Sequence, residues 1–441
     1  MTRNAFLAVL FAALFTGGCN GSESGSPEQG AAASADAPVE SAEADAPDAQ
    51  AAPESASDEA ATTARAAEET RTPNAEWQEP AFEGQTRAPR PAETATWTLE
   101  TIAEGLDHPW ALDILPDGAL LVTERPGTLR VVTLDGQISE PIAGVPEVHA
   151  VAQGGLLDVA LAPDFEQSRR IYLTYAEPTE EASRTAAATA ILSEDRSNLT
   201  GVDVIFRQQP EFESRGHYGS RIVFDRDGRL YITLGDRMDR SRELAQDPSN
   251  TIGTVARINP DGSIPEDNPF VDDPGKADAI WSWGHRNIQA ADLHPETGEL
   301  WTIEHGPAGG DELNNPEAGE NYGWPAVTYG ENYNGTRVTE GVTQREGTEQ
   351  PVYYWDPVIA PSGMDFYTGD AFPTWQGDLF IGGLASAKVV RLVFDGERVA
   401  AEEWLPVGER VRDVREAPDG SLYLVTDMDN GKLMRIVPGD E

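Results

Sequence analysis

A histidine between two glycines and an aspartate that ends a later strand could together take a proton from a substrate. His217 lies in the segment GHYG at residues 216–219, and Asp236 follows an apolar strand predicted at residues 230–234. The flanking glycines predict an accessible imidazole in a turn, and the strand can return Asp236 to its side. A carboxylate that fixes an imidazole is a general-base arrangement. The alternative is a structural histidine, which is the commoner role of a single histidine.

A glycine-rich acidic loop offers the oxygen ligands that calcium prefers. Residues 304–314 read EHGPAGGDELN, so that Asp311 and Glu312 follow two glycines. Carboxylate oxygens and exposed backbone carbonyls are hard donors that suit Ca²⁺. The alternative is a solvated acidic loop, which is common in a chain with so many acidic residues.

Two arginines at alternating positions indicate an anionic ligand. Arg410 and Arg412 share one face of a predicted strand, because side chains alternate along β-structure. The chain has 32 Lys and Arg against 76 Asp and Glu, so cations on a shared face are informative. Arg286 lies in a further polar segment, WSWGHRN at residues 281–287.

A repeated turn and strand must position these residues. Six times, a turn rich in Asp, Pro or Gly precedes a short apolar strand, and the predicted strands occupy residues 120–123, 171–174, 230–233, 300–303, 379–381 and 422–425. One repeated β unit predicts an all-β fold, a six-bladed β-propeller, in which most candidate residues follow a strand that ends at a central channel. The alternative is a β-sandwich with repetitive turns, which does not account for six copies across the domain.

The bulk composition limits the partners. The chain has 441 residues with 42 Gly and 32 Pro, and its formal net charge is −44. The many glycines and prolines suit a fold built on turns. Nucleic acid is excluded as a partner, because phosphate backbones require a basic surface.

The first residues predict export and a lipid anchor. Residues 1–19 place Arg3 before an apolar stretch at residues 5–15, which is too short to span a bilayer and is typical of a signal peptide. Small residues precede Cys19, the sole cysteine, as in a bacterial lipobox. We therefore expect an exported lipoprotein of the periplasm or cell envelope, in contact with the membrane only through this anchor. The alternative is an ordinary cleaved signal with an incidental cysteine.

A linker is expected between the anchor and the folded domain. Residues 20–95 are dominated by Ala, Glu, Asp, Pro, Ser and Thr, with almost no large apolar side chains. Such a segment buries too little surface to offset its ordering entropy, so we expect it to be disordered and its deletion to leave the stability of the domain unchanged. The propeller domain is expected at residues 96–441.

Taken together, these segments resemble the glucose/sorbosone dehydrogenase family, and most closely its soluble aldose sugar dehydrogenases. Their conjunction, in the family's order over residues 102–436, is far more specific than any single motif. The matching segments are QGGLL at 153–157, GHYGSR at 216–221, GD at 235–236, GHRN at 284–287, EHGP at 304–307, GDEL at 310–313, NYGWP at 321–325 and RVRDV at 410–414. The resemblance implies a six-bladed propeller that binds the quinone cofactor PQQ.

The resemblance also implies roles for the matching residues. His217 matches the catalytic base, Asp236 the carboxylate that orients it, and Gln153 a residue near the substrate and cofactor. The residues that match the holders of the PQQ carboxylates and quinone oxygens are Arg286, Asn287, Arg410 and Arg412. The residues that match calcium ligands are Gly306 and Pro307, through carbonyls on an ion that bridges to PQQ, and Glu312 and Tyr322, on a second, structural ion.

Two departures from the family are informative. The family often has a lysine where this sequence has Ala385, and Lys388, three residues later, is the remaining candidate for contact with the cofactor. The dimer-forming loop of glucose-specific members is not found, which predicts a monomer that accepts a range of sugars.

The expected reaction is oxidation of the anomeric hydroxyl of an aldose to a lactone by hydride transfer to calcium-bound PQQ. Arginine forks suit a planar tricarboxylate, and Ca²⁺ makes a quinone a better hydride acceptor. An external acceptor, a cytochrome or a quinone, would take the electrons. The alternatives are a calcium-dependent propeller lactonase or other hydrolase, and a non-catalytic sugar-binding or scaffolding propeller. Neither alternative needs a cationic clamp.

Overall fold

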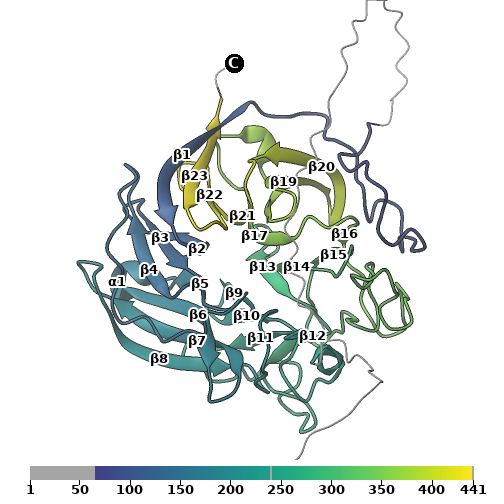
Figure 1. The fold of residues 1–441 in the computed structure, drawn as a ribbon, viewed down its shortest axis with the longest axis horizontal. Coiled ribbons are helices and arrows are strands. Elements are labelled where there is room, and N and C mark those ends of the chain that lie inside the picture. The colour runs from purple at the N-terminus through teal and green to yellow at the C-terminus, as the bar shows by residue number, and fades with distance from the viewer. Residues whose placement is uncertain (1–64, 239–240, 440–441) are drawn as a thin grey trace, which may run out of the picture. The chain divides into compact units, whose positions relative to one another are not determined.

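Six β-sheets surround a central axis in the computed structural model, which describes residues 65–238 and 241–439 (Figure 1). The predicted all-β, six-bladed β-propeller is confirmed. The expected signal peptide, Cys19 and the first part of the expected linker lie outside the described residues. In the described part of the chain, no helix has the length and hydrophobicity needed to cross a membrane. Its helices are α1 (Phe165–Ser168) and the 3-10 turns η1 (Arg242–Gln246) and η2 (Pro373–Trp375).

The sheets are blades I to VI in chain order, with strands given from the channel outward. Blade I consists of β2 (Pro109–Ile114), β3 (Leu120–Glu124) and β4 (Thr128–Val132). Blade II consists of β5 (Leu156–Leu161), β6 (Arg170–Pro178), β7 (Ser183–Leu192) and β8 (Leu199–Arg207). Blade III consists of β9 (Gly219–Phe224), β10 (Leu230–Leu234), β11 (Thr254–Ile258) and β12 (Ile280–Trp283).

The remaining blades complete the ring. Blade IV consists of β13 (Ile288–Leu293), β14 (Leu300–Glu304), β15 (Asp311–Asn314) and β16 (Tyr353–Trp355). Blade V consists of β17 (Pro361–Phe366), β18 (Leu379–Gly383), β19 (Lys388–Asp395) and β20 (Arg398–Pro406). Blade VI consists of β21 (Val411–Glu416), β22 (Leu422–Thr426), β23 (Gly431–Pro438) and β1 (Trp97–Leu106). Because β1 pairs antiparallel with β23, the first strand of the chain closes the last blade.

The repeat seen in the sequence is the second strand of each blade. The six predicted strands lie within β3, β6, β10, β14, β18 and β22. Five of these six strands are buried along their whole length, since neighbouring blades cover both faces of each sheet. A strand buried on both faces reads as a continuous apolar run, which is why the repeat was visible.

Carboxylates on the innermost strands connect most blades to the next. At five of the six junctions, an Asp oxygen accepts a backbone N–H from the neighbouring blade's innermost strand. These acceptors and donors are Asp113 with Leu161, Asp158 with Ile222, Asp292 with Phe366, Asp365 with Glu416 and Asp413 with Leu112, at 2.6–3.0 Å. We call these five side chains the aspartate ring.

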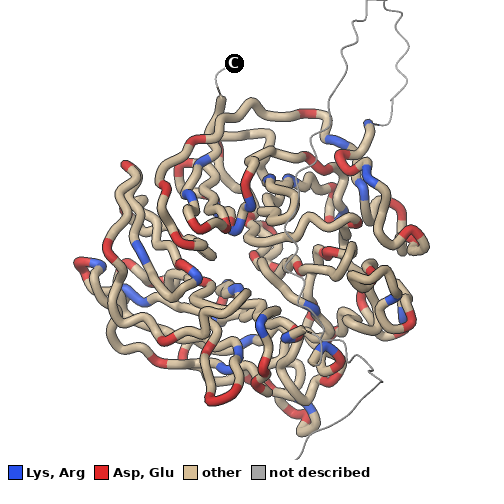
Figure 2. The backbone as a smooth tube through the Cα atoms, in the orientation of Figure 1, with Lys and Arg blue, Asp and Glu red and all other residues tan. Residues whose placement is uncertain are grey.

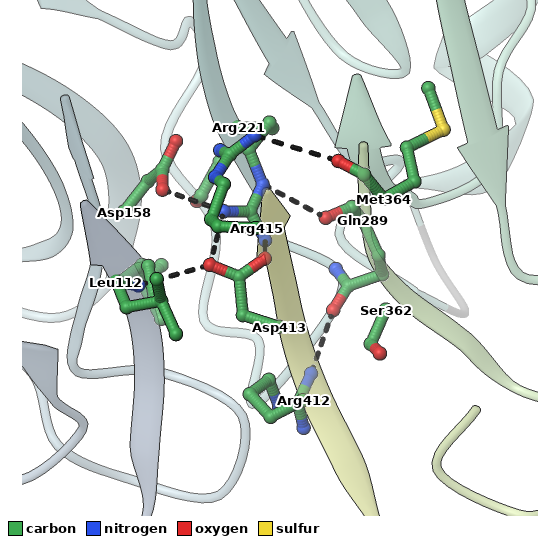
Figure 3. A network of polar contacts seen from close by, with 12 residues as sticks. Leu112, Asp158, Arg221, Gln289, Ser362, Met364, Arg412, Asp413 and Arg415 are labelled. Carbon is green, nitrogen blue, oxygen red and sulfur yellow. Dashed lines mark hydrogen bonds and ion pairs between the residues drawn. The ribbon is translucent and has the colours of Figure 1, made fainter. Parts of the chain in front are cut away.

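Arg221, which is buried, and Arg415, which is half-buried, balance part of this negative charge. Arg221 lies between Asp158 and Asp413, at 2.8 and 3.2 Å (Figure 3). Although burial opposes it, the carboxylates of Asp413 and Asp365 raise the pKa of Arg415. Burial raises the pKa of Asp158 to about 6, and the nearby charges of Arg221 and Arg415 oppose this rise.

Residues 65–95, here called the arm, pack against blades IV and V (Figure 1). The prediction of a disordered linker is therefore wrong for this part of the chain. The arm covers edge strands: the N–H of Tyr354 in β16 donates to Gln85 and the N–H of Glu402 in β20 donates to Pro89, at 2.9 and 3.0 Å. Composition did not indicate this, because hydrogen bonds to free strand edges, and not large apolar side chains, hold the arm.

We expect removal of the arm to destabilise the propeller. A chain that begins at residue 96 loses the backbone pairing of Gln85 and Pro89, and each lost hydrogen bond costs about 1 kcal/mol of unfolding free energy. Relative to a chain that begins at residue 65, its melting temperature should fall by roughly 3 °C or more. Calorimetry of the two chains makes the comparison, and equal melting temperatures would show that the arm contributes nothing to stability.

Candidate functional site

Polar residues from the blades converge on a cavity of about 160 Å³ at the end of the channel where the innermost strands begin. The polar side chains that line it are Arg125, Gln153, Asn287, Gln289, His305, Arg410, Arg412 and Asp427. Acidic residues occur on all six blades (Figure 2), so a cavity with three lining arginines and one carboxylate departs from the charge of the whole chain.

His217 and Asp236 form a hydrogen-bonded pair beside this cavity. Nδ1 of His217 lies 2.6 Å from Oδ1 of Asp236. The other oxygen of Asp236 accepts Nε1–H of Trp324 at 2.7 Å, and Oδ1 also accepts the N–H of Met238 at 2.7 Å. A carboxylate that accepts these bonds fixes Nδ1 of His217 as a donor, which leaves Nε2 as the acceptor. The predicted association of the two residues is observed.

Close backbone approaches explain the glycines around His217. His217 and Gly219 have left-handed backbones, with φ of 51° and 66°. A Cβ at Gly216 would lie 2.7 Å from Oε1 of Gln153, and that oxygen accepts the N–H of His217 at 2.8 Å. The glycines are thus needed for a tight turn and not for exposure. The expectation of an accessible imidazole is wrong, because His217 is only 6% exposed.

Burial of His217 and Asp236 acts in opposite directions on their two pKa values. Burial lowers the pKa of His217, and Arg286 adds to this effect while Asp236 opposes it. Burial acts to raise the pKa of Asp236, but His217 and Arg286 outweigh it and the pKa is lowered. At neutral pH the pair is therefore a neutral imidazole hydrogen-bonded to a carboxylate.

The predicted arginine pair lies at the start of β21, where both guanidinium groups contact one carboxylate. Arg412 and Arg410 approach Asp427 at 2.7 and 3.3 Å, and Arg125 approaches it at 3.7 Å. Nη1 of Arg412 also donates to Gln289 at 3.2 Å. Although burial opposes it, these arginines lower the pKa of Asp427 strongly. Three cations around one carboxylate leave the cavity wall positive.

Arg286 and Asn287 connect the pair to the cavity. Nη1 of Arg286 donates to the carbonyl of His305 at 2.9 Å, and its backbone carbonyl accepts the N–H of Asp236 at 2.8 Å. Asn287 lines the cavity, and its side-chain oxygen accepts the N–H of Gly219 at 3.2 Å. Both residues therefore lie between the His217 turn and the loop after β14.

The loop after β14 and the first two residues of β15 contain four of the predicted calcium ligands, and the partners of their oxygens differ. One oxygen of Asp311 accepts the N–H of Gly306 at 2.9 Å, and the other accepts those of Ile359 and Ala360, both at 2.8 Å. These bonds give both oxygens backbone partners, so Asp311 shapes the loop. Burial raises its pKa to about 7.

Glu312 remains a candidate ligand. It pairs across the sheet with Glu304, and it lines a small cavity with Gly306. Burial and the adjacent Glu304 raise the pKa of Glu312 well above its usual range. Two carboxylates that repel one another in a buried place are relieved by a cation.

The hydroxyl of Tyr322 forms hydrogen bonds elsewhere and not with Glu304 or Glu312. It donates to the carbonyl of Asn315 at 2.5 Å and accepts the N–H of Glu317 at 3.0 Å. Its ring stacks on His285 at 4.7 Å. Over residues 65–238 and 241–439, no three His, Cys, Asp or Glu side chains converge as a metal-ligand set. Any ion here would therefore depend on backbone carbonyls as well.

Lys388 does not line the cavity. Its ammonium group lies 3.4 Å from the ring centroid of Trp404, between the arm and β20, and burial lowers its pKa. Leu384 occupies the corresponding part of the cavity wall instead. The structure thus separates Lys388 from the other predicted cofactor-binding residues.

Sequence reasoning missed several lining residues, above all Arg125, His305 and Asp427. Each directly follows the second strand of its blade, after β3, β14 and β22. Asp236 lies one residue beyond the corresponding position after β10. The residues after every second strand were therefore the available signal, and only some of them were selected.

The chain is similar to known dehydrogenases over most of its length. The sequence model of a family described as Glucose / Sorbosone dehydrogenase matches residues 106–435. An aldose sugar dehydrogenase of Escherichia coli (strain K12) is 45% identical over 352 residues, which cover 79% of this chain and 94% of that protein. The crystal structure of a glucose dehydrogenase, 48% identical, superposes with a TM-score of 0.75 and covers 78% of this chain and 100% of the other. The PQQ-bound form of an aldose sugar dehydrogenase from Streptomyces coelicolor, 29% identical, has a TM-score of 0.65 and covers 78% and 99%.

We expect Asp236→Asn to lower the pKa of His217 further. The negative charge of Asp236 favours the imidazolium, so its removal leaves burial and Arg286 unopposed. Titration of the His217 ring by NMR measures the change. Trp324→Phe is the matched control, since it removes a hydrogen bond to Asp236 but keeps the charge. A His217 pKa that is unchanged or raised in Asp236→Asn would contradict the electrostatic account.

Proposed function

Because the chain belongs to the glucose/sorbosone dehydrogenase family, we propose that it oxidises the anomeric hydroxyl of aldose sugars to lactones. In this proposal PQQ is the cofactor, Ca²⁺ is the ion bound with it, and His217 is the general base. The observation that carries the proposal is the His217–Asp236 pair beside a cavity walled by arginines. The relatives described as aldose sugar dehydrogenases, one of them with PQQ bound, support the substrate class and the cofactor.

The arginines fit a planar tricarboxylate. Nε of Arg412 and Nε of Arg286 are buried donors without a partner among the described residues, and unsatisfied buried donors are costly. Carboxylate and quinone oxygens are the acceptors that guanidinium groups bind best. We assign Arg286, Arg410 and Arg412 to the binding of PQQ, with Asn287 and Gln153 as further polar contacts.

The loop after β14 fits a cation. The carbonyls of Gly306 and Pro307 are the proposed ligands nearest the cofactor, and Glu312 with Glu304 offers a second place where a cation would relieve repulsion. When bound, PQQ would supply the two-electron acceptor of the reaction, and Ca²⁺ would polarise its quinone.

The proton step depends on residues of the chain alone. Nε2 of neutral His217 accepts the proton of the anomeric hydroxyl, while Nδ1–H stays bonded to Asp236. Asp236 stabilises the imidazolium that forms, and Trp324 keeps the carboxylate oriented. Gln153 holds the backbone of His217 and lines the cavity, so it places the base relative to the sugar.

The sequence supports proposals for the partners and the location of the enzyme. We propose a monomer that passes electrons to an external acceptor, a cytochrome or a quinone. The signal-like residues 1–19 and Cys19 support export and lipid anchoring in the periplasm or cell envelope.

Reconstitution tests the proposed function. Purified cofactor-free protein is given PQQ and Ca²⁺, separately and together, and the reduction of a redox dye is followed with several aldoses. We expect turnover only with both additions, and its loss on chelation. Hydrolysis of sugar lactones with Ca²⁺ alone, and no dye reduction, would favour a propeller lactonase instead.

His217→Gln should abolish most of the turnover without loss of fold or PQQ. Loss of a general base typically costs a factor of about 10²–10⁴. In the unaltered enzyme the rate should fall as the pH drops below the pKa of His217, which burial lowers from its ordinary value, because the protonated ring cannot accept the proton. His108→Gln is the matched control: His108 also contacts an aspartate, Asp107 at 2.8 Å, but at the surface. Near-normal turnover in PQQ-loaded His217→Gln would refute the assignment.

Arg412→Ala should weaken PQQ binding more than it weakens folding. A charge-assisted hydrogen bond contributes about 1.5–3 kcal/mol, which is roughly tenfold or more in affinity. Titration of PQQ by fluorescence quenching gives the affinity, and a melting curve of the same sample gives the stability. Arg435→Ala is the control, because Arg435 pairs with Glu100 across β23 and β1, away from the cavity. Equal PQQ affinity in Arg412→Ala and the unaltered protein would remove Arg412 from the site.

A further inference from the structure

Two segments flank the loop at residues 306–310 and determine its path. On one side, Ala308 and Glu331 exchange two backbone hydrogen bonds, at 2.9 and 3.0 Å. On the other side, the N–H of Gly310 donates to the carbonyl of Trp355 at 2.8 Å, and a Cβ at Gly309 would lie 2.5 Å from the carboxylate of Asp356. The loop is therefore held between residues 328–331 and residues 355–356.

The arm holds both of these flanking segments. The backbone N–H groups of Asn74 and Ala75 donate to the two oxygens of Asp356, at 2.8 and 2.9 Å. The side-chain amide of Gln78 donates to the carbonyls of Thr328 and Gly330, at 3.1 and 3.2 Å. Five residues of the arm, 74–78, thus reach across both sides of one loop.

The two flanking segments pack so closely against the loop that a small displacement of either would also displace the loop. The backbone of Gly330 is so close to Gly310 that a Cβ on Gly310 would lie 2.6 Å from the nitrogen of Gly330. The carboxylate of Asp356 packs directly against Gly309. Neither flank can move without moving the loop, because close-packed backbone transmits displacement.

We propose that residues 74–78 of the arm are a positioning element for the loop at residues 306–310, and that they set its affinity for Ca²⁺. The part that concerns Ca²⁺ rests on the proposed function, whereas the positioning of the loop does not. The arm precedes residue 106, where the family match begins, so this support is an addition to the matched domain.

Gln78→Ala and Asp356→Asn test the proposal in the full chain. The first removes both amide donors, and the second removes the charge and one acceptor of the arm's N–H groups. We expect amide hydrogen exchange within residues 304–312 to accelerate about fivefold to tenfold in each variant, the factor given by the loss of a typical hydrogen bond. Calorimetric titration with Ca²⁺ should show a fall in affinity of similar size.

Phe82→Ala is the matched control. Phe82 belongs to the arm, and Cζ of Arg398 in blade V lies 5.4 Å from the centroid of its ring. It should leave the exchange of residues 304–312 and the Ca²⁺ affinity unchanged. Unchanged exchange of the loop in both test variants, or equal acceleration in Phe82→Ala, would overturn the positioning role. Absence of Ca²⁺ binding in the unaltered protein would instead count against the proposed metal, and hydrogen exchange would still decide the role of the arm.

Discussion

The aspartate ring is the constraint on which the rest of the structure depends. Each of its members takes a backbone N–H from the next blade, so the innermost strands cannot shift along one another without breaking a buried hydrogen bond. The functional residues sit on or beside the same strands: Arg412 directly precedes the ring member Asp413. The register of the innermost strands therefore determines which side chains enter the cavity.

Charge is separated along the channel. Arg221 and Arg415 serve the carboxylates of the ring, whereas Arg410 and Arg412 share Asp427 and face the cavity. In a chain with a net charge of −44, this division keeps one positive wall inside an acidic protein. An anionic cofactor would meet the arginines only after it enters the cavity, where water competes less for the same donors.

The sequence predicted what depends on local pattern and missed what depends on distant pairing. The second strands were visible because they are apolar along their whole length, and the association of His217 with Asp236 follows from one turn and one strand. The prediction of Asp311 as a calcium ligand took no account of distant partners, since one of its oxygens accepts the N–H groups of Ile359 and Ala360. The arm was misjudged for the same reason: its partners lie in β16 and β20, and its own composition does not reveal them.

Arg286 joins the two halves of the site. Its carbonyl receives the N–H of Asp236, its own N–H donates to Glu304, and its guanidinium binds the carbonyl of His305. The same positive charge helps to lower the pKa of both His217 and Asp236, so the base stays neutral and its partner stays ionised. One residue thus couples the proton acceptor in blade III to the loop in blade IV. The protonation state of the base and the position of the loop are for this reason not independent, and a ligand that draws Arg286 toward itself acts on both.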